Sequence, residues 1–243
     1  MTARKAAILM SAFAAFLLLV AACGGGGGGG GEEDGTTAGD ISDEQLTQMA
    51  LSRSEWGDEY AALEPLASVL EEREQTAQHV SEDEAQDLER FGELKSYEDG
   101  CRREGAFQEG TGLFRVATRV HLFKSGKGAS GYVEDDLADL EEEISKERGR
   151  TTIHSVDRFA VEGIGDESLG LQISMSFLSD YGPSSIYQTM AWFREGRILA
   201  FVAIMRLDKK DVRAEVSALA RKLHGHIRAV LGGQVTPTAV GTQ

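Results

Sequence analysis

The stretch "WFREGRILAFVAI", residues 192–204, gives the clearest indication of the fold. Residues 186–194 and 198–205 are rich in apolar and aromatic side chains, and Glu195-Gly196 between them fits a two-residue hairpin turn. The second segment is apolar on both faces, which predicts a central strand. Strands joined by so short a turn pair antiparallel, so the stretch predicts an antiparallel sheet.

Further strands are predicted before this hairpin. Residues 114–122 and 169–177 alternate apolar with polar or small side chains, as half-buried strands do, and residues 153–161 fit a short strand. Because these segments follow one another with few intervening residues, we expect most of them to pair in one sheet.

Two segments have the periodicity of amphipathic helices. Apolar residues recur every three or four positions over residues 129–144, and again from a cap at Asp208 to the stop at Gly232. Each apolar helix face needs a surface to pack on, which the sheet supplies. We therefore expect an α+β domain over residues 93–233, with an antiparallel sheet of about five to six strands packed with two amphipathic helices.

Residues 41–92 are acidic and mostly helical in pattern. Ser42 and Gln45 fit a capping box at the start of a helix. Leu63, Leu66 and Leu70 fall on one face of a further helix, although Pro65 weakens it. We interpret the segment as a lightly packed helical extension, and a mobile acidic stalk is the alternative.

The N-terminus has the parts of a secretory signal peptide, residues 1–22, with two basic residues followed by an apolar run. The sequence Val20-Ala21-Ala22-Cys23 resembles the lipobox of bacterial lipoproteins. That resemblance implies cleavage before Cys23, acylation of Cys23, and lipid anchoring to the outer face of the cytoplasmic membrane, or to an outer membrane if there is one. An uncleaved anchor and ordinary secretion with an unused thiol remain alternatives.

Two segments lack any folding pattern. Residues 23–40 include eight consecutive glycines, which have no side chain to pack, so we expect a flexible tether after the lipidated cysteine. Residues 234–243 are expected to form a disordered tail.

The charge and cysteine content limit the partners. The 243 residues include 40 acidic residues against 25 Lys and Arg, a formal net charge of −15. This balance argues against nucleic acid as a partner, because phosphate contacts require basic patches. Once Cys23 is lipidated, only Cys101 remains, so no disulfide can form within the chain. Cys101 is free or bridged to another chain.

A glycine motif at residues 126–131 matches G-x-G-x-x-G after a strand and before a helix, which is the context of a dinucleotide-binding turn. Against that interpretation, the preceding strand alternates in polarity and the following segments look like hairpins. We expect a helix start capped by Ser125 instead, and no cofactor.

The other candidate motifs also favour structural roles. His224 and His226 lie two residues apart, so on a helix they point to different faces and cannot converge on one metal ion. The acidic run over residues 135–143 lacks the spacing of a calcium loop, and we expect a solvated helix face. Without a recognisable catalytic motif, the sequence predicts a protein that is not an enzyme.

Aromatic residues gather on the predicted strands. They are Phe177, Tyr187, Trp192, Phe193 and Phe201. Most aromatic residues at alternating positions belong to a core, and the alternative is that some line a groove for a small apolar ligand or a protein partner.

The order of elements over residues 94–231 is similar to that of small exported α/β domains, including PsbP-like proteins and the sensor-like domains of actinobacterial lipoproteins. The latter carry paired cysteines, which this chain lacks. The resemblance implies a non-catalytic, membrane-anchored domain that binds a ligand or protein. The alternative is an envelope structural or assembly factor that acts through the acidic residues 41–92.

Overall fold

A computed structural model describes residues 41–61, 63–66, 69–72, 82–110, 112–142, 144, 147–148, 151–179 and 182–233. Within them, one antiparallel sheet runs in the order β1-β3-β4-β9-β8-β7-β6-β5, and β2 also pairs with β3. The strands are β1 (Glu64–Pro65), β2 (Val69–Glu72), β3 (Glu93–Arg102), β4 (Leu113–Phe123), β5 (Glu147–Arg148), β6 (Thr151–Phe159), β7 (Glu167–Ser179), β8 (Gly182–Glu195) and β9 (Ile198–Arg206). The predicted antiparallel α+β fold is confirmed, with more strands than the expected five to six.

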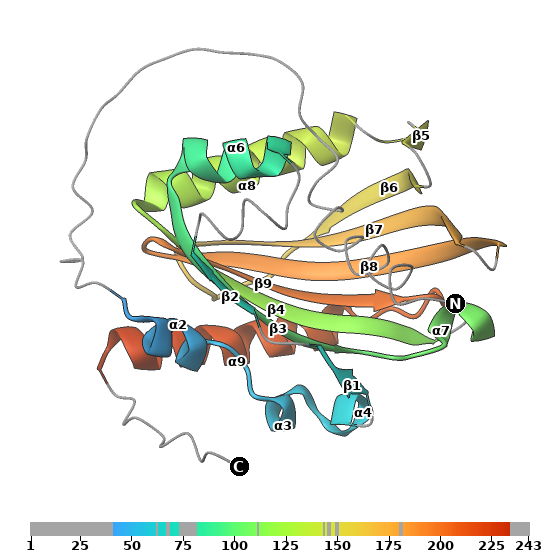
Figure 1. Cartoon of the computed structure of the whole chain (residues 1–243), viewed down its shortest axis with the longest axis horizontal. Coiled ribbons are helices and arrows are strands. Elements are labelled where there is room, and N and C mark those ends of the chain that lie inside the picture. The colour runs from blue at the N-terminus through green and yellow to red at the C-terminus, as the bar shows by residue number, and fades with distance from the viewer. Residues whose placement is uncertain are drawn as a thin grey trace.

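Helices cover both sides of the sheet (Figure 1). They are α2 (Asp43–Met49), α3 (Arg53–Trp56), α4 (Asp58–Ala61), α6 (Glu82–Phe91), α7 (Ala106–Glu109), α8 (Gly126–Glu142) and α9 (Arg213–Leu231). Helix α9 packs along β8 and β9 with α2 beside it, and α8 lies over the opposite side with α6. We call these two sides of the sheet the α9 face and the α8 face.

The β8–β9 hairpin forms where the sequence predicts it. Trp192 lies opposite Phe201, and Glu195 lies opposite Ile198, so the two turn residues are Gly196 and Arg197. The turn therefore begins one residue later than expected, with Gly196 at the positive φ of 57° that type I′ turns favour. Strand β9 is buried along its whole length between β4 and β8, which confirms its central position.

Strand β4 departs from its predicted half-buried character, because it is buried on both faces. Its polar positions include Arg119, which is 7% exposed, and His121, which is fully buried. The physical reason is the layer of α6 and α8, which covers the face that the sequence pattern assigns to solvent.

The leucines at 63, 66 and 70 do not share a helix, so that expectation was wrong. Two short strands, β1 and β2, instead pair with the outer edge of β3, which the sequence pattern also did not reveal. Pro65 disfavours a continuing helix, and the open edge of β3 offers backbone hydrogen bonds. Leu66 takes one of them, since its N–H donates to the Gly100 carbonyl.

Residues 41–61 pack against the domain. The capping box of Ser42 and Gln45 is confirmed. Leu46, Met49, Leu51, Trp56 and Tyr60 are buried in the same core as α9. This segment is therefore built into the α9 face. Residues 1–40 and 234–243, where the signal peptide, lipobox, tether and tail are predicted, lie outside the described residues.

The helix ends show one confirmed cap and one error. Ser125 caps α8 as predicted, with its hydroxyl 3.1 Å from the Gly128 nitrogen. Asp208 does not cap α9, because it pairs with the Arg206 guanidinium at the end of β9, and α9 begins at Arg213. Among the described residues, we find no helix that is both long and apolar enough to cross a membrane.

A buried polar cluster as the candidate functional site

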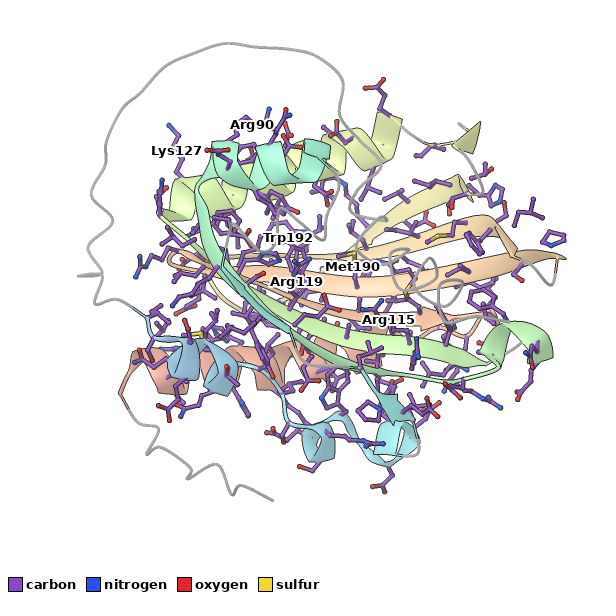
Figure 2. The ribbon with its side chains drawn as sticks, viewed as in Figure 1. Arg90, Arg115, Arg119, Lys127, Met190 and Trp192 are labelled. Atoms are coloured by element: carbon purple, nitrogen blue, oxygen red, sulfur yellow. The ribbon has the colours of Figure 1, made fainter. Side chains whose placement is uncertain are left out.

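The α8 face carries polar side chains at the centre of the sheet, where an apolar layer is usual. Ser96 pairs in register with His121, and Glu98 with Arg119, so these side chains project from neighbouring strands on one side. In β9, Phe201 lies opposite Arg119 and belongs to the core beneath α8, which places the set on the α8 face. Figure 2 shows Arg115, Arg119, Met190 and Trp192 over the middle of the sheet.

Glu93 and His121 form the most deeply buried pair. Both side chains are fully buried, and the His121 Nδ1 atom is in hydrogen-bond contact with Glu93 Oε1. Burial lowers the pKa of His121, and the nearby Arg119 charge lowers it further against the opposing effect of Glu93. Burial would raise the pKa of Glu93, but His121 and Arg119 outweigh it, so the pKa is lowered. Burial and Arg119 favour a neutral His121, whose Nδ1–H donates to the Glu93 carboxylate.

Aromatic rings surround His121 on the α8 face. Its ring lies 5.4 Å from Phe201, 6.1 Å from Phe123 and 6.2 Å from Tyr132, between ring centroids. The Nε2 atom is buried and has no hydrogen-bond partner within the described part of the chain. The neighbouring Ser96 hydroxyl is instead 3.5 Å from Arg119 Nη2. The group therefore lacks the hydrogen bond between nucleophile and base that a serine–histidine–carboxylate triad needs.

Two arginines and a second carboxylate extend the cluster along β3 and β4. Arg115 forms an ion pair with Glu98, and Arg119 Nε lies 4.0 Å from the same carboxylate. Burial lowers the pKa of Arg115, against the opposing effect of Glu98. Glu93 and Glu98 thus balance Arg115 and Arg119, and with a neutral His121 these five residues carry no net charge.

Several buried polar atoms on the α8 face lack hydrogen-bond partners among the described residues. They include Glu93 Oε2, His121 Nε2, Gln188 Oε1, Trp192 Nε1 and Arg194 Nε. Leaving such an atom unpaired costs about 1–3 kcal/mol, so a group of them is not expected from packing alone. We call Glu93, His121 and Trp192 the buried polar cluster. Gln188 lies on the same face but in the row of Arg115, about eight residues along the sheet from the row of Glu93.

The predicted aromatic residues lie on both faces of the sheet. Phe177, Trp192 and Phe201 belong to the core on the α8 face, whereas Phe193 belongs to the core on the α9 face. Tyr187 shares the side of Phe193, because residues alternate along β8. Trp192, Phe193 and Phe201 are at most 8% exposed, as core residues are. A part for any of them in binding stays a prediction.

The glycines of the G-x-G-x-x-G motif have a packing role. A Cβ atom at Gly128 would lie 2.2 Å from the Phe91 carbonyl oxygen, and one at Gly131 would lie 2.9 Å from the Phe91 ring. The motif thus lets α6 approach α8 closely, as the helix-start interpretation allows. This close approach completes the layer above the buried polar cluster.

The acidic run of α8 is not uniformly solvated, contrary to expectation. Asp136 lies four residues after Tyr132 and four before Leu140, both buried, so it belongs to the inner side of the helix. Burial, together with Asp139, Asp135 and Asp87, raises the pKa of Asp136 to about 8. The described residues contain no group of three or more His, Cys, Asp or Glu side chains placed to hold a metal ion.

Of the two cysteines, Cys101 lies among the described residues and Cys23 does not. Cys101 is a buried free thiol, 3% exposed on the α9 face, and burial raises its pKa to about 11, so it is protonated at neutral pH. Cys23 lies outside the described residues, and its lipidation stays a prediction.

Sequence patterning missed Glu93, His121 and Gln188. The polar positions of β4 suggested a solvent-facing side, and β3 itself was not foreseen. The available signal was the pair of amphipathic helices, since two such helices on one sheet cover both of its faces. Polar residues of a central strand must then be buried.

No protein-family model matches this chain. No curated protein matches its sequence. Among solved structures, the extracellular domain of PknH from Mycobacterium tuberculosis is similar, with a TM-score of 0.50 and 11% identity over 76% of this chain and 97% of that one. A protein of unknown function from Pseudomonas aeruginosa, PA94, a putative regulator, has a TM-score of 0.26 and 10% identity over 46% of this chain and 72% of that one. The chain therefore shares its fold with an extracellular domain.

Proposed function

We propose that this protein is a lipid-anchored extracytoplasmic domain that binds a small ligand on its α8 face without catalysing a reaction. The observation that carries the proposal is the number of buried polar atoms without hydrogen-bond partners on the α8 face, among them those of the buried polar cluster. Binding sites place a few polar groups among apolar and aromatic side chains, as this face does. The likeness of the fold to an extracellular domain supports a location outside the cytoplasm.

The cluster suggests the chemistry of the ligand. The charges of Glu93 and Glu98 are balanced by Arg115 and Arg119, which favours a neutral molecule. The unpaired atoms on this face include acceptors, such as Glu93 Oε2 and Gln188 Oε1, and donors, such as Trp192 Nε1 and Arg194 Nε. The ligand is therefore expected to present hydroxyl groups, which both donate and accept, beside an apolar surface that packs on Trp192.

Binding requires movement on the α8 face, because the unpaired atoms are covered in this structure. Helices α8 and α6 cover this side of the sheet, and α7 contributes Ala106 and Phe107 to the same core. A ligand that satisfies the unpaired atoms would offset the free energy needed to lift this layer.

Native mass spectrometry of the full-length protein, extracted in detergent from its own membranes, tests the binding proposal. We expect an additional small-molecule mass on the wild type and its loss from Trp192→Phe/Gln188→Leu. Phe193→Leu, a change of similar kind on the α9 face, serves as control and should keep the mass. A wild type without bound mass, or a double variant that keeps it, would contradict the proposal.

The anchor is tested separately by metabolic labelling with a palmitate analogue. Labelling of the wild type and of Cys101→Ser, and its loss in Cys23→Ala, is the expected result. Unchanged labelling of Cys23→Ala would overturn the lipid anchor and leave the binding proposal standing.

A further inference from the structure

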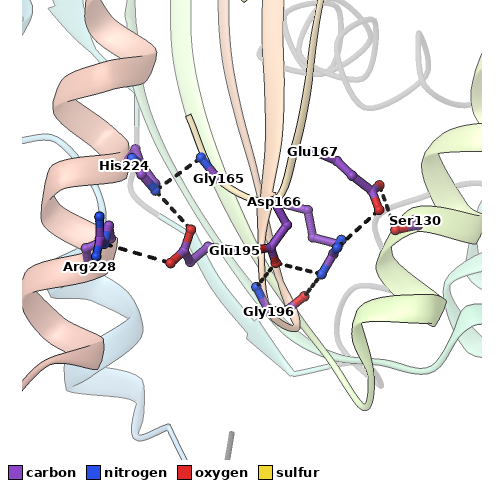
Figure 3. A network of polar contacts seen from close by, with 9 residues as sticks. Ser130, Gly165, Asp166, Glu167, Glu195, Gly196, His224 and Arg228 are labelled. Carbon is purple, nitrogen blue, oxygen red and sulfur yellow. Dashed lines mark hydrogen bonds and ion pairs between the residues drawn. The ribbon is translucent and has the colours of Figure 1, made fainter. Parts of the chain in front are cut away.

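His224 and His226 of α9 contact different parts of the chain. His226 Nε2 lies 2.7 Å from Glu55 Oε1, and its Nδ1 lies 3.2 Å from the Ala50 carbonyl oxygen. His224 faces the end of the sheet, where it meets Gly165 and Glu195 (Figure 3). The two rings therefore diverge, as their spacing predicts, and serve separate contacts.

One atom of His224 is placed between a donor and an acceptor. Its Nε2 lies 3.2 Å from the Gly165 backbone nitrogen and 3.0 Å from Glu195 Oε2. The Gly165 N–H needs a lone pair on Nε2, whereas the Glu195 carboxylate needs a proton there. The two hydrogen bonds exclude each other, so the protonation of Nε2 selects which one forms.

The charged groups around His224 come from two elements. Glu195 at the end of β8 faces the ring, and its other oxygen lies 3.9 Å from Arg228 Nε, one turn further along α9. Arg221 precedes His224 by three residues on the same helix and is exposed. The Phe193 ring packs edge-on against the imidazole, with centroids 5.4 Å apart, and closes its inner side.

The residues after Gly165 connect this contact to both layers of helices. The Asp166 N–H donates to the Arg194 carbonyl at 2.7 Å, and the Asp166 carboxylate accepts from the Gly196 N–H at 2.8 Å. The Arg194 guanidinium lies 3.1 Å from Glu167 Oε1.

The other oxygen of Glu167 accepts from the Ser130 hydroxyl of α8 at 2.8 Å. Figure 3 shows this chain of contacts running from α9 around the end of the sheet to α8. The loop that His224 contacts therefore leads directly into Glu167, the first residue of β7, which contacts α8.

We propose that His224 is a proton-operated latch, in which the neutral ring with its proton on Nδ1 holds the Gly165 N–H, and the ring protonated on both nitrogens releases it to bind Glu195. Histidine side chains change charge between pH 5 and 8, a range that an exported protein meets as its surroundings acidify. Release detaches the loop at Gly163–Asp166 from α9 and leaves its contacts to the hairpin in place. The latch does not depend on the proposed ligand or on the lipid anchor.

An NMR titration of the full-length, ¹⁵N-labelled protein in detergent tests the latch. The Gly165 amide resonance should move along a single sigmoid between pH 8 and pH 5. Its hydrogen exchange, corrected for intrinsic pH dependence, should accelerate at least about five-fold at the acid end, because an amide that loses its acceptor exchanges faster.

Three variants separate the latch from a passive contact. His224→Gln should abolish the titration of Gly165, and Glu195→Gln should move its midpoint to lower pH, because the protonated ring loses its carboxylate. His226→Gln, the matched control, should leave the Gly165 titration unchanged. A Gly165 amide that does not respond to pH, or one that titrates equally in His224→Gln or Glu195→Gln, would overturn the proposal.

Discussion

The two faces of one sheet are built in different ways. The α9 face is an apolar core in which α9 packs along β8 and β9, and residues 41–61 add buried side chains around it. The α8 face buries Glu93, His121 and Gln188 on the sheet, and α6 and α8 pack over this side. The α9 face therefore stabilises the fold through apolar packing, whereas buried polar groups on the α8 face lower its stability. Such a local loss of stability is the pattern expected of a binding face.

The largest effect on the free energy of unfolding is expected from a large-to-small substitution in the apolar core of the α9 face. Phe193→Ala leaves a cavity beside α9 and should lower the free energy of unfolding by about 3–5 kcal/mol. Phe177→Ala on the α8 face removes a half-buried ring and should lower it by about 1–2 kcal/mol. Urea unfolding of both variants measures the difference, and equal losses would contradict the contrast between the faces.

Glu93 and His121 form a buried polar pair on the α8 face. Replacing one member should lower the free energy of unfolding more than replacing both. His121→Phe leaves the Glu93 carboxylate buried without its partner and should destabilise the protein by about 3 kcal/mol. Glu93→Leu/His121→Phe removes both polar groups but leaves Glu98 alone to balance Arg115 and Arg119, so it should recover part of that loss. A double variant as unstable in urea as the single one would disprove the buried pair.

Asp136 gives the α8 face a distinct dependence on pH. Its folded-state pKa of about 8 exceeds the value of about 3.9 for an unfolded chain, so the folded state holds the proton more tightly. The resulting stability is fully present below about pH 4 and is lost as the pH rises to 8.

Asp136→Asn should therefore raise the free energy of unfolding by about 1–3 kcal/mol at pH 8 and change it little at pH 4. Glu134→Gln, an exposed acid on the same helix, is the control and should have no such pH-dependent effect. Thermal unfolding at the two pH values measures it. An Asp136→Asn effect that is the same at both would refute the inner placement of this carboxyl.

The smallest effects on stability are expected from glycine-to-alanine substitutions, one in α8 and one in α9. Gly131→Ala on α8 would bring a Cβ atom to 2.9 Å from the Phe91 ring and should cost about 1 kcal/mol through displaced α6 packing. Gly225→Ala on α9 meets nothing within 4 Å and should stabilise the helix by about 0.5–1 kcal/mol. Both follow from denaturant midpoints, and changes of the same sign would count against the tight α6–α8 contact.

The sequence predicted the elements that have a regular apolar periodicity or a local turn motif. The β8–β9 hairpin, β7 and both long helices follow from apolar periodicity and from one glycine turn. What it did not predict depends on neighbours far away in sequence. The strand character of residues 64–72 depends on the open edge of β3, and the burial of Arg119 depends on the layer of α6 and α8.

The candidate site could be anticipated only in outline. The N-terminal motif and the element order predict an exported binding domain, but the five aromatic residues divide between the two faces. Glu93 and His121 are 28 residues apart in the sequence and meet only through the register of β3 and β4. Likewise, His224 and Gly165 are 59 residues apart, and no local sequence pattern predicts their contact.

Hydrogen–deuterium exchange tests the central claim, that the α8 face binds and the α9 face supports. The full-length protein in detergent is compared before and after addition of a low-molecular-weight extract of the same cell envelopes. We predict slower exchange in α8 and in β4, and unchanged exchange in α9. Exchange that is unaltered throughout, or slowed in α9 alone, would contradict the account.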